Sequence, residues 1–292
     1  MRDARVFSRG TRSVAAACGR FFETLPGAQK TALVILALIA LASLAASWLA
    51  PSYAAQFRDA ISVPPSARFP LGTDELGRDR LARLLYGTRV SLLLAPAAAL
   101  LSTVMAALLG GTAGYLGGRW ERAVTSGIDL FLALPWLFLL LAVRALMPLN
   151  TSPITSVILT FVLLGGLGWA SPARIIRAGT RAIANSDYLL QARSSGVSGA
   201  RLFFRHLLPN LRPILAAQFL ISIPVFILSE ANLSLLGLGV SEPLPSWGGM
   251  LRELENYTAV LENPWMLAPV ALLIAVVSCL QLLLRTEDSI PC

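Results

Sequence analysis

The chain has 292 residues, of which 55% are hydrophobic and only 14% are charged, and its mean hydropathy is +0.68. Soluble globular domains carry about 25% charged residues, so this composition excludes an ordinary soluble domain. It also excludes an intrinsically disordered chain, a collagen-like repeat and a small disulfide scaffold. An integral membrane protein is the class that remains.

The charged residues favour a membrane over nucleic acid as the partner. The formal net charge is +8, and every basic residue except Lys30 is an arginine. These arginines lie between apolar runs, where orientation in a membrane explains them. The three cysteines, Cys18, Cys279 and Cys292, are scattered and form no CxxC pair, so we predict neither a disulfide nor a zinc site from them.

Several chemistries are excluded by residues that the chain lacks. A phosphate-binding P-loop needs the pattern GxxxxGK[ST], and Lys30 has no glycine in the required place. With His206 as the only histidine, an HExxH zinc site is impossible. We therefore expect a non-enzymatic chain with no catalytic residue, no metal site and no cofactor of its own.

Six apolar stretches are long enough to cross a membrane, whose hydrocarbon core of about 30 Å needs roughly 20 apolar residues in a helix. The sequence thus predicts an all-α membrane protein with about six transmembrane helices. The first stretch could instead be a cleaved signal peptide, but it exceeds the roughly 7–15 apolar residues usual there, which favours an anchor. The stretches are residues 31–50, about 90–116, about 124–147, 154–170, about 214–240 and 264–284.

The placement of arginines predicts the orientation of the chain. Basic residues are more frequent in the segments that share a side with the N-terminus, and the basic side of a membrane protein faces the cytoplasm. Both termini are therefore predicted to be cytoplasmic, with tails at residues 1–30 and 286–292. Segment 51–89 is an exception, because it falls on the outer side although its arginines outnumber its acids.

The extracytoplasmic loop 51–89 is predicted to contain a short amphipathic helix. Leu81, Leu84 and Leu85 recur at helical spacing, and Asp79 can pair with Arg83 four residues further on. We expect this helix to lie along the outer membrane surface before the second span.

The remaining five-helix core, residues 90–285, includes a basic cytoplasmic loop at about 171–213. Ser186 and Ser198 can each cap a short helix in this loop. Gly196 would end the first helix, Pro209 would stop the second, and Asn210 would cap the entry to the fifth span. The leucine and phenylalanine side chains of both helices need cover, either from the protein's own inner end or from a partner.

The same loop resembles the EAA loop of ABC importer permeases. In that pattern a glycine is followed after nine residues by H-x-L-P-N, and Gly196 and the sequence HLLPN at 206–210 show this separation. More of the chain, about residues 30–285, is similar to the C-type permease subunit of the dipeptide/oligopeptide/nickel subgroup. The matching elements are LGTDELGRD at 71–79, SEANLSLLGLG at 229–239 and PSWG at 245–248. Two departures are the EAA triplet, which reads LQA at 190–192, and the segment after the sixth span.

This resemblance implies a type I ABC importer fold in which the loop docks onto an ATPase subunit. The family arrangement implies a homologous second permease subunit, two ABC ATPase subunits that bind ATP and Mg²⁺, and an extracytoplasmic substrate-binding protein. The chain would form half of a pathway for di- or oligopeptides or similar solutes across a bacterial-type cytoplasmic membrane. By family likeness the coupling residues are Tyr188, Leu189, Leu190, Gln191, Ala192, Gly196, His206, Pro209 and Asn210.

Three ionisable residues fall at or near membrane depth, where such groups mark transport pathways or internal pairs. Asp129 and Glu230 can line a translocation cavity or bond between helices, and for Glu230 we favour the bond. Arg144 is expected to extend its guanidinium toward the membrane surface. A rival function, an ion- or proton-coupled secondary transporter, would use Asp129 and Glu230, although no inverted repeat is visible. A membrane scaffold is a third alternative. The glycine-rich run 110–118 predicts close helix packing or a turn.

Overall fold

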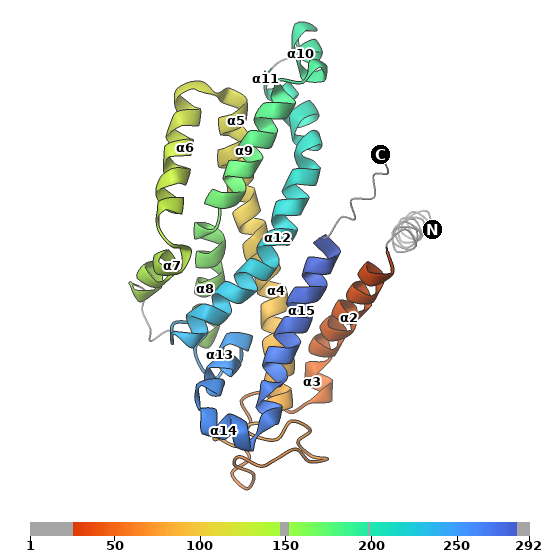
Figure 1. Cartoon of the computed structure of the whole chain (residues 1–292), viewed down its shortest axis with the longest axis vertical. Coiled ribbons are helices and arrows are strands. Elements are labelled where there is room, and N and C mark those ends of the chain that lie inside the picture. Colours follow the sequence, from red (N-terminus) through yellow and green to blue (C-terminus); the bar gives the residue numbers. More distant parts are fainter. Residues whose placement is uncertain (1–25, 147–151, 198, 285–292) are drawn as a thin grey trace, which may run out of the picture.

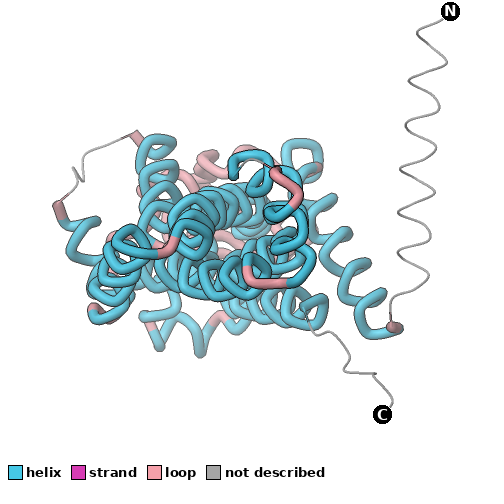
Figure 2. Tube along the Cα trace, turned by 90° about the horizontal axis from the view of Figure 1, so that it is seen from above, coloured by secondary structure: helices cyan, strands magenta, loops and turns pink. Residues whose placement is uncertain are grey.

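A computed structural model describes residues 26–146, 152–197 and 199–284. Within these ranges the chain is mostly helical and contains no strand, apart from one isolated bridge between Thr73 and Asp79. Viewed along its length, the molecule is a bundle of helices side by side (Figure 2), and its longest described connection without helix is residues 50–79. The predicted all-α fold is confirmed.

The helices follow one another in an up-and-down order along the bundle (Figure 1). Their bounds are α2 Gly27–Leu44, α3 Ala46–Leu49, α4 Arg80–Ala106, η1 Ala107–Gly111, α5 Thr112–Leu116, α6 Gly118–Ala133, α7 Trp136–Ala145, α8 Pro153–Leu167, α9 Ala170–Ala184, α10 Asp187–Ser194, α11 Gly199–Leu202, η2 Phe203–Leu207, α12 Leu208–Leu235, α13 Trp247–Arg252, η3 Glu253–Glu255, α14 Tyr257–Glu262, η4 Pro264–Leu267 and α15 Ala268–Leu284.

Five helical stretches are long and apolar enough to cross a membrane, and a sixth exists if the bent pair α6–α7 counts as one span. The five are Gly27–Leu44, Arg80–Leu116, Pro153–Ala184, Phe203–Leu235 and Pro264–Leu284. The first helix begins inside the predicted tail 1–30, and the predicted tail 286–292 lies outside the described residues. The helical segments are longer than most predicted spans because the helices continue past the last apolar residues into charged turns.

The predicted surface helix in segment 51–89 is wrong. Residues from Arg80 onward form the first turns of α4, which continues through η1 and α5 to Leu116. The expected pair of Asp79 with Arg83 is also absent: the Asp79 carboxylate caps α4 by accepting the Leu81 N–H at 2.9 Å. Arg83 is buried and pairs with other carboxylates, so the leucine spacing belongs to a buried helix and not to a surface helix.

The predicted loop 171–213 is mostly helix. The first part of this range is the rest of α9, and α12 begins at Leu208. Pro209 does not stop the second short helix, because it comes directly after a wide π turn, in which the Leu208 N–H bonds to the carbonyl of Phe203 five residues back. The wide π turn η2 precedes it, so α11, η2 and α12 form one continuous helical path. Asn210 is accordingly not a cap, and Ser198 lies outside the described residues.

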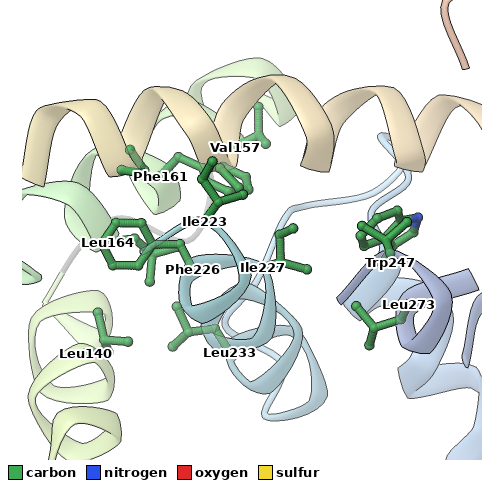
Figure 3. Close-up of a cluster of buried hydrophobic side chains, with 14 of the residues drawn as sticks. Leu140, Val157, Phe161, Leu164, Ile223, Phe226, Ile227, Leu233, Trp247 and Leu273 are labelled. Carbon is green, nitrogen blue, oxygen red and sulfur yellow. The ribbon is translucent and has the colours of Figure 1, made fainter. Parts of the chain in front are cut away.

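The main hydrophobic core lies where α4, α8, α12 and α15 meet. Phe161 and Leu164 of α8 point toward Ile223 and Phe226 of α12 beneath the α4 ribbon, and Trp247 extends the cluster toward α15 (Figure 3). The Trp247 indole is fully buried and donates to the Thr88 hydroxyl at 2.9 Å. This core joins the long helices into one body along most of their length.

Close backbone contact joins η1 and α5 to α9. A Cβ atom on Gly110 would lie 2.3 Å from the carbonyl oxygen of Ala173, and one on Gly114 would lie 2.5 Å from that of Arg177. Only glycine permits this approach, as in other small-residue helix contacts. The packing role predicted for the glycine-rich run is confirmed.

Candidate functional site

The short helix α10 projects from one end of the bundle, beside α11 and the end of α9 (Figure 1). It ends as the sequence predicts: Gly196 has a φ of +79°, and its position is open, with no atom within 4 Å of a Cβ built on it. The hydroxyl of Ser186, just before the helix, donates to the carbonyl of Ile183 at 2.7 Å. The left-handed residue turns the chain back toward α11.

One face of this segment packs onto the protein itself. Leu189 of α10, Leu202 of α11, and Leu207 and Leu211 further along are each no more than 2% exposed and form one cluster. Tyr115 of α5 packs against the same cluster, and its hydroxyl donates to the carbonyl of Gly199 at 3.0 Å. The expectation that these helices cover the protein's own end holds for this face.

Other side chains of this segment, beside the buried leucines, are left uncovered. The side chains of Tyr188, Leu190 and Phe204 are 54%, 47% and 67% exposed. Gln191 is also exposed, whereas Ala192 is half-buried against the leucine cluster. Exposed apolar and aromatic side chains gathered at the end of a helical bundle mark an interaction surface. We call Tyr188, Leu190 and Phe204 the docking face.

Hydrogen bonds hold the two halves of the segment together. The hydroxyl of Tyr188 lies 2.7 Å from Nδ1 of His206, and the Asn210 side-chain amide donates to the carbonyl oxygen of His206 at 2.8 Å. These contacts join α10, η2 and the first turn of α12. The structure therefore brings Tyr188, His206 and Asn210 into contact, although they are up to 22 positions apart in the sequence.

Asp129 and Glu230 occupy two separate environments. The carboxylate of Asp129 on α6 accepts from Arg174 of α9 at 2.5 Å, and both side chains are half exposed. Nearby, Glu121 accepts from Arg177 at 2.6 Å and from Arg181 at 3.0 Å. Part of the basic face of α9 is thus explained by ion pairs with α6, in addition to the orientation of the chain in the membrane.

Glu230 is 1% exposed and forms an internal contact. Its carboxyl accepts the Ser234 hydroxyl, one turn further along α12, at 2.7 Å. This bond lies within α12, whose Ser234 is packed closely by Gly248 of α13. The bond between helices that we favoured for Glu230 stays a prediction.

The expected path of Arg144 to the membrane surface is wrong. Its side chain is 1% exposed and donates to the carbonyl oxygen of Leu238 at 3.0 Å and to the Ser156 hydroxyl at 3.1 Å. Ser241 donates to the same Ser156 oxygen at 3.0 Å. Arg144 finds these acceptors because the loop after α12 folds back over the ends of α7 and α8.

At the other end of the bundle, a network of six charged residues joins two distant segments. Arg83 is central: it donates to Asp74 at 2.8 Å, to Glu242 at 3.0 Å and to Glu253 at 2.5 Å. Arg78 pairs with Asp74 at 2.7 Å and with Glu242, and Arg80 pairs with Glu253 at 2.7 Å. We call this network the outer cap. Its members are Asp74, Arg78, Arg80, Arg83, Glu242 and Glu253.

Burial and neighbouring charges shift the carboxyl pKa values at this end of the bundle in opposite directions. Burial alone would raise the pKa of Asp74, but hydrogen bonds from Arg78 and the charges of Arg83 and Arg78 outweigh it and lower that pKa. At Asp79 burial dominates over two backbone hydrogen bonds and raises the pKa. The motif LGTDELGRD contains two of the six members, Asp74 and Arg78, but only the fold reveals the partners at Glu242 and Glu253.

The described part of the chain offers no group of three His, Cys, Asp or Glu residues placed to hold a metal ion. Its fold and sites instead define a multi-pass membrane protein with a docking face at one end and a charged cap at the other.

Comparison with known proteins names the class more closely. The family model described as "Binding-protein-dependent transport system inner membrane component" matches residues 106–286. The chain belongs to this family, and the resemblance inferred from its motifs is confirmed. It is a membrane subunit of a transport system that works with other components.

Individual relatives extend the similarity over most of the chain. The di/tripeptide transport system permease protein of Pseudomonas aeruginosa is 37% identical over 240 residues, 80% of this chain and 76% of that protein. The oligopeptide transport system permease protein of Haemophilus influenzae is 31% identical over 251 residues, 85% of this chain and 78% of its own. That of Mycobacterium tuberculosis is 32% identical over 225 residues, 77% and 75% respectively.

These relatives do not favour the rival secondary transporter. Both carboxylates that it would use are engaged, Asp129 by Arg174 and Glu230 by Ser234. The matched family depends on a binding protein, as its description states.

Proposed function

We propose that this chain is the permease subunit of an ATP-driven ABC importer for di- or oligopeptides or similar small solutes. It forms half of the translocation pathway, and a homologous second permease forms the other half. Two ABC ATPase subunits, which bind ATP and Mg²⁺, dock at the α10 end, and a substrate-binding protein delivers the solute at the outer-cap end. In this arrangement the α10 end and both termini are cytoplasmic, in a bacterial-type inner membrane.

The docking face is the observation that carries the proposal. Tyr188, Leu190 and Phe204 are exposed on a segment that buried leucines anchor to the bundle. A partner that seats these side chains gains apolar contact, and the buried leucines prevent the segment from moving alone. The segment connects α9 to α12, which belong to the candidate spans Pro153–Ala184 and Phe203–Leu235. Movement of the partner is thereby transmitted into the membrane.

The peptide substrate class is supported by the relatives. Two of the three are named for oligopeptide transport and one for di/tripeptide transport. The chain matches each of them over at least three quarters of its own length. Peptides are therefore the first solutes to test.

Uptake into vesicles tests the proposal. The tagged chain is purified together with its subunits, reconstituted with the binding protein, and supplied with a radiolabelled dipeptide. We expect co-purification of ATPase subunits and uptake that needs ATP inside the assembled system and survives an ionophore. Uptake that survives ATP depletion but collapses with the ion gradient would support the secondary transporter instead. Purification without any ATPase subunit would contradict the importer.

A further inference from the structure

A cavity of about 210 Å³ lies beside the elbow between α6 and α7. Leu132 and Trp136 line it from the elbow, Gly168 from the α8–α9 junction, and Gln218 and Ser222 from α12. In Figure 1 the elbow and the α8–α9 junction lie about halfway between the α10 end and the α14 end of the bundle. The cavity is therefore remote from both the docking face and the outer cap.

Two interruptions of helix meet at this cavity. The axes of α6 and α7 differ by 87°, with Leu134 in an extended conformation and Pro135 after it. Pro135 has no N–H, so the carbonyl of Phe131 loses its helical donor. The second interruption separates α8, which ends at Leu167, from α9, which begins at Ala170. Irregular backbone at membrane depth is tolerated where it is buried in protein or lines a water-filled cavity.

The polar groups of the cavity point to a solute, not to a lipid chain. Gln218 and Ser222 are 8% and 7% exposed, and the Ser222 hydroxyl donates to the backbone carbonyl of Gln218 at 2.7 Å. Polar side chains facing lipid are costly, whereas binding sites place a few polar groups among apolar ones. The side-chain amide of Gln218 can both donate to and accept from the hydrogen-bonding groups of a peptide backbone.

The other residues that line the cavity determine which side chains of a solute can bind in it. None of the residues that line the cavity is Asp, Glu, Lys or Arg. A charged side chain would enter without a partner, and burying an unpaired charge is strongly unfavourable. Apolar side chains instead meet Leu132, Trp136 and Ile221. On the closed side, Gly168 lies against Phe226, whose ring would be 2.6 Å from an added Cβ, so the space is bounded there.

We propose that this cavity is a solute station in the translocation pathway, which receives an uncharged, apolar side chain of the transported peptide. The inference rests on the proposed function and refines its substrate class to peptides with apolar side chains. The peptide backbone bonds to the Gln218 amide while the side chain fills the apolar space. Peptides with charged side chains are disfavoured at this station.

Filling the cavity tests the station. Ile221 lines it and is 45% exposed, so Ile221→Trp narrows the space without disturbing the core. Leu220 is the matched control, because it is the preceding residue of α12, is 42% exposed and does not line the cavity. Uptake of leucylleucine, diglutamate and glycylglycine is measured in vesicles that contain the full complex, together with ATP hydrolysis.

We expect Ile221→Trp to lower leucylleucine uptake about tenfold and glycylglycine uptake less than twofold. Leu220→Trp is expected to change neither, and the unsubstituted complex is expected to take up leucylleucine in preference to diglutamate. Equal losses for both peptides, no loss at all, or the same loss in Leu220→Trp would overturn the station.

A second variant tests the station in case the Ile221→Trp complex does not assemble. Ile221→Ala enlarges the cavity and is expected to favour ditryptophan over leucylleucine, and an unchanged ratio would overturn the station. These outcomes are separate from those for the proposed function. If the unsubstituted complex shows no ATP-driven uptake of any peptide, the importer function itself is overturned. If uptake is ATP-driven but does not change with substitutions at Ile221, only the solute station is overturned.

Discussion

The two ends of the bundle are stabilised in opposite ways. The outer cap is held by ion pairs around a fully buried Arg83, so segments about 170 positions apart form one rigid unit. The α10 segment packs a buried leucine cluster against the bundle but leaves Tyr188, Leu190 and Phe204 exposed. A surface completed within the chain does not need a partner for its stability. A surface left with exposed apolar side chains offers a partner additional apolar contact.

The largest effect is expected from breaking the outer cap at its centre. Arg83→Met removes the guanidinium and leaves the buried carboxylate of Asp74 with fewer partners. Loss of one partner of a buried ion pair costs about 3–5 kcal/mol. Thermal unfolding of the purified protein in detergent measures the cost. Arg68→Met is the control, since its pair with Asp59 is more than half exposed and is worth about 1 kcal/mol or less. Similar losses in both variants would contradict a central role for Arg83.

An intermediate effect is expected from Asp74→Asn, and it depends on pH. Because the pKa of Asp74 is lowered by folding, its stabilisation is fully present above the unfolded pKa near 3.8 and is lost as the pH falls through the lower folded pKa. The variant should lose about 1.5–3 kcal/mol near neutral pH and show a flatter acid limb. The Asp79 carboxyl has the opposite effect on the pH dependence of stability. Because burial raises its pKa, folding favours its protonated form. Unfolding followed from pH 7 down to acid, with Asp59→Asn as the exposed control, tests this. A variant with an unchanged acid limb would contradict it.

The smallest change in stability is expected at the α10 end. Tyr188→Phe removes the hydroxyl that lies 2.7 Å from His206 Nδ1, at an exposed position, so unfolding should change by about 1 kcal/mol or less. Stimulation of ATP hydrolysis by the loaded binding protein should nevertheless fall, because α10 is held less firmly to η2. Tyr257→Phe at the other end is the control, with its side chain 72% exposed. Unaltered stimulation in Tyr188→Phe would separate this hydrogen bond from coupling.

Local patterns in the sequence predicted much of the fold, but they did not predict long-range pairing. Apolar runs gave the candidate spans, and Gly196 gave the turn after α10, because both depend on neighbouring residues. The helix at 81–87 was misassigned because Arg80 and Arg83 resemble surface residues until Glu242 and Glu253 are placed beside them. The same reason applies to Arg144, whose acceptors Leu238 and Ser156 come from other segments.

The candidate site was predicted through the motif and not through the geometry. The spacing of Gly196 and His206 identified the α10 segment, whereas the contact of Tyr188 with His206 depends on how η2 turns. Pro209 was misread because a proline that usually ends a helix can also follow directly after a wide π turn within a continuous helical path. The cavity at the α6–α7 elbow had no signal beyond Pro135, because its walls come from three separate parts of the chain.

The central claim is that the α10 segment transmits the action of the ATPase subunits to the membrane helices. It is tested most directly by ATP hydrolysis in the reconstituted complex with Gly196→Asp, compared with Gly118→Asp. Both glycines have positive φ, +79° and +63°, and neither has an atom within 4 Å of an added Cβ, so backbone strain and added charge are matched. We predict that only Gly196→Asp assembles but loses stimulation by the loaded binding protein. Unchanged stimulation in Gly196→Asp, or an equal loss in Gly118→Asp, would contradict the claim.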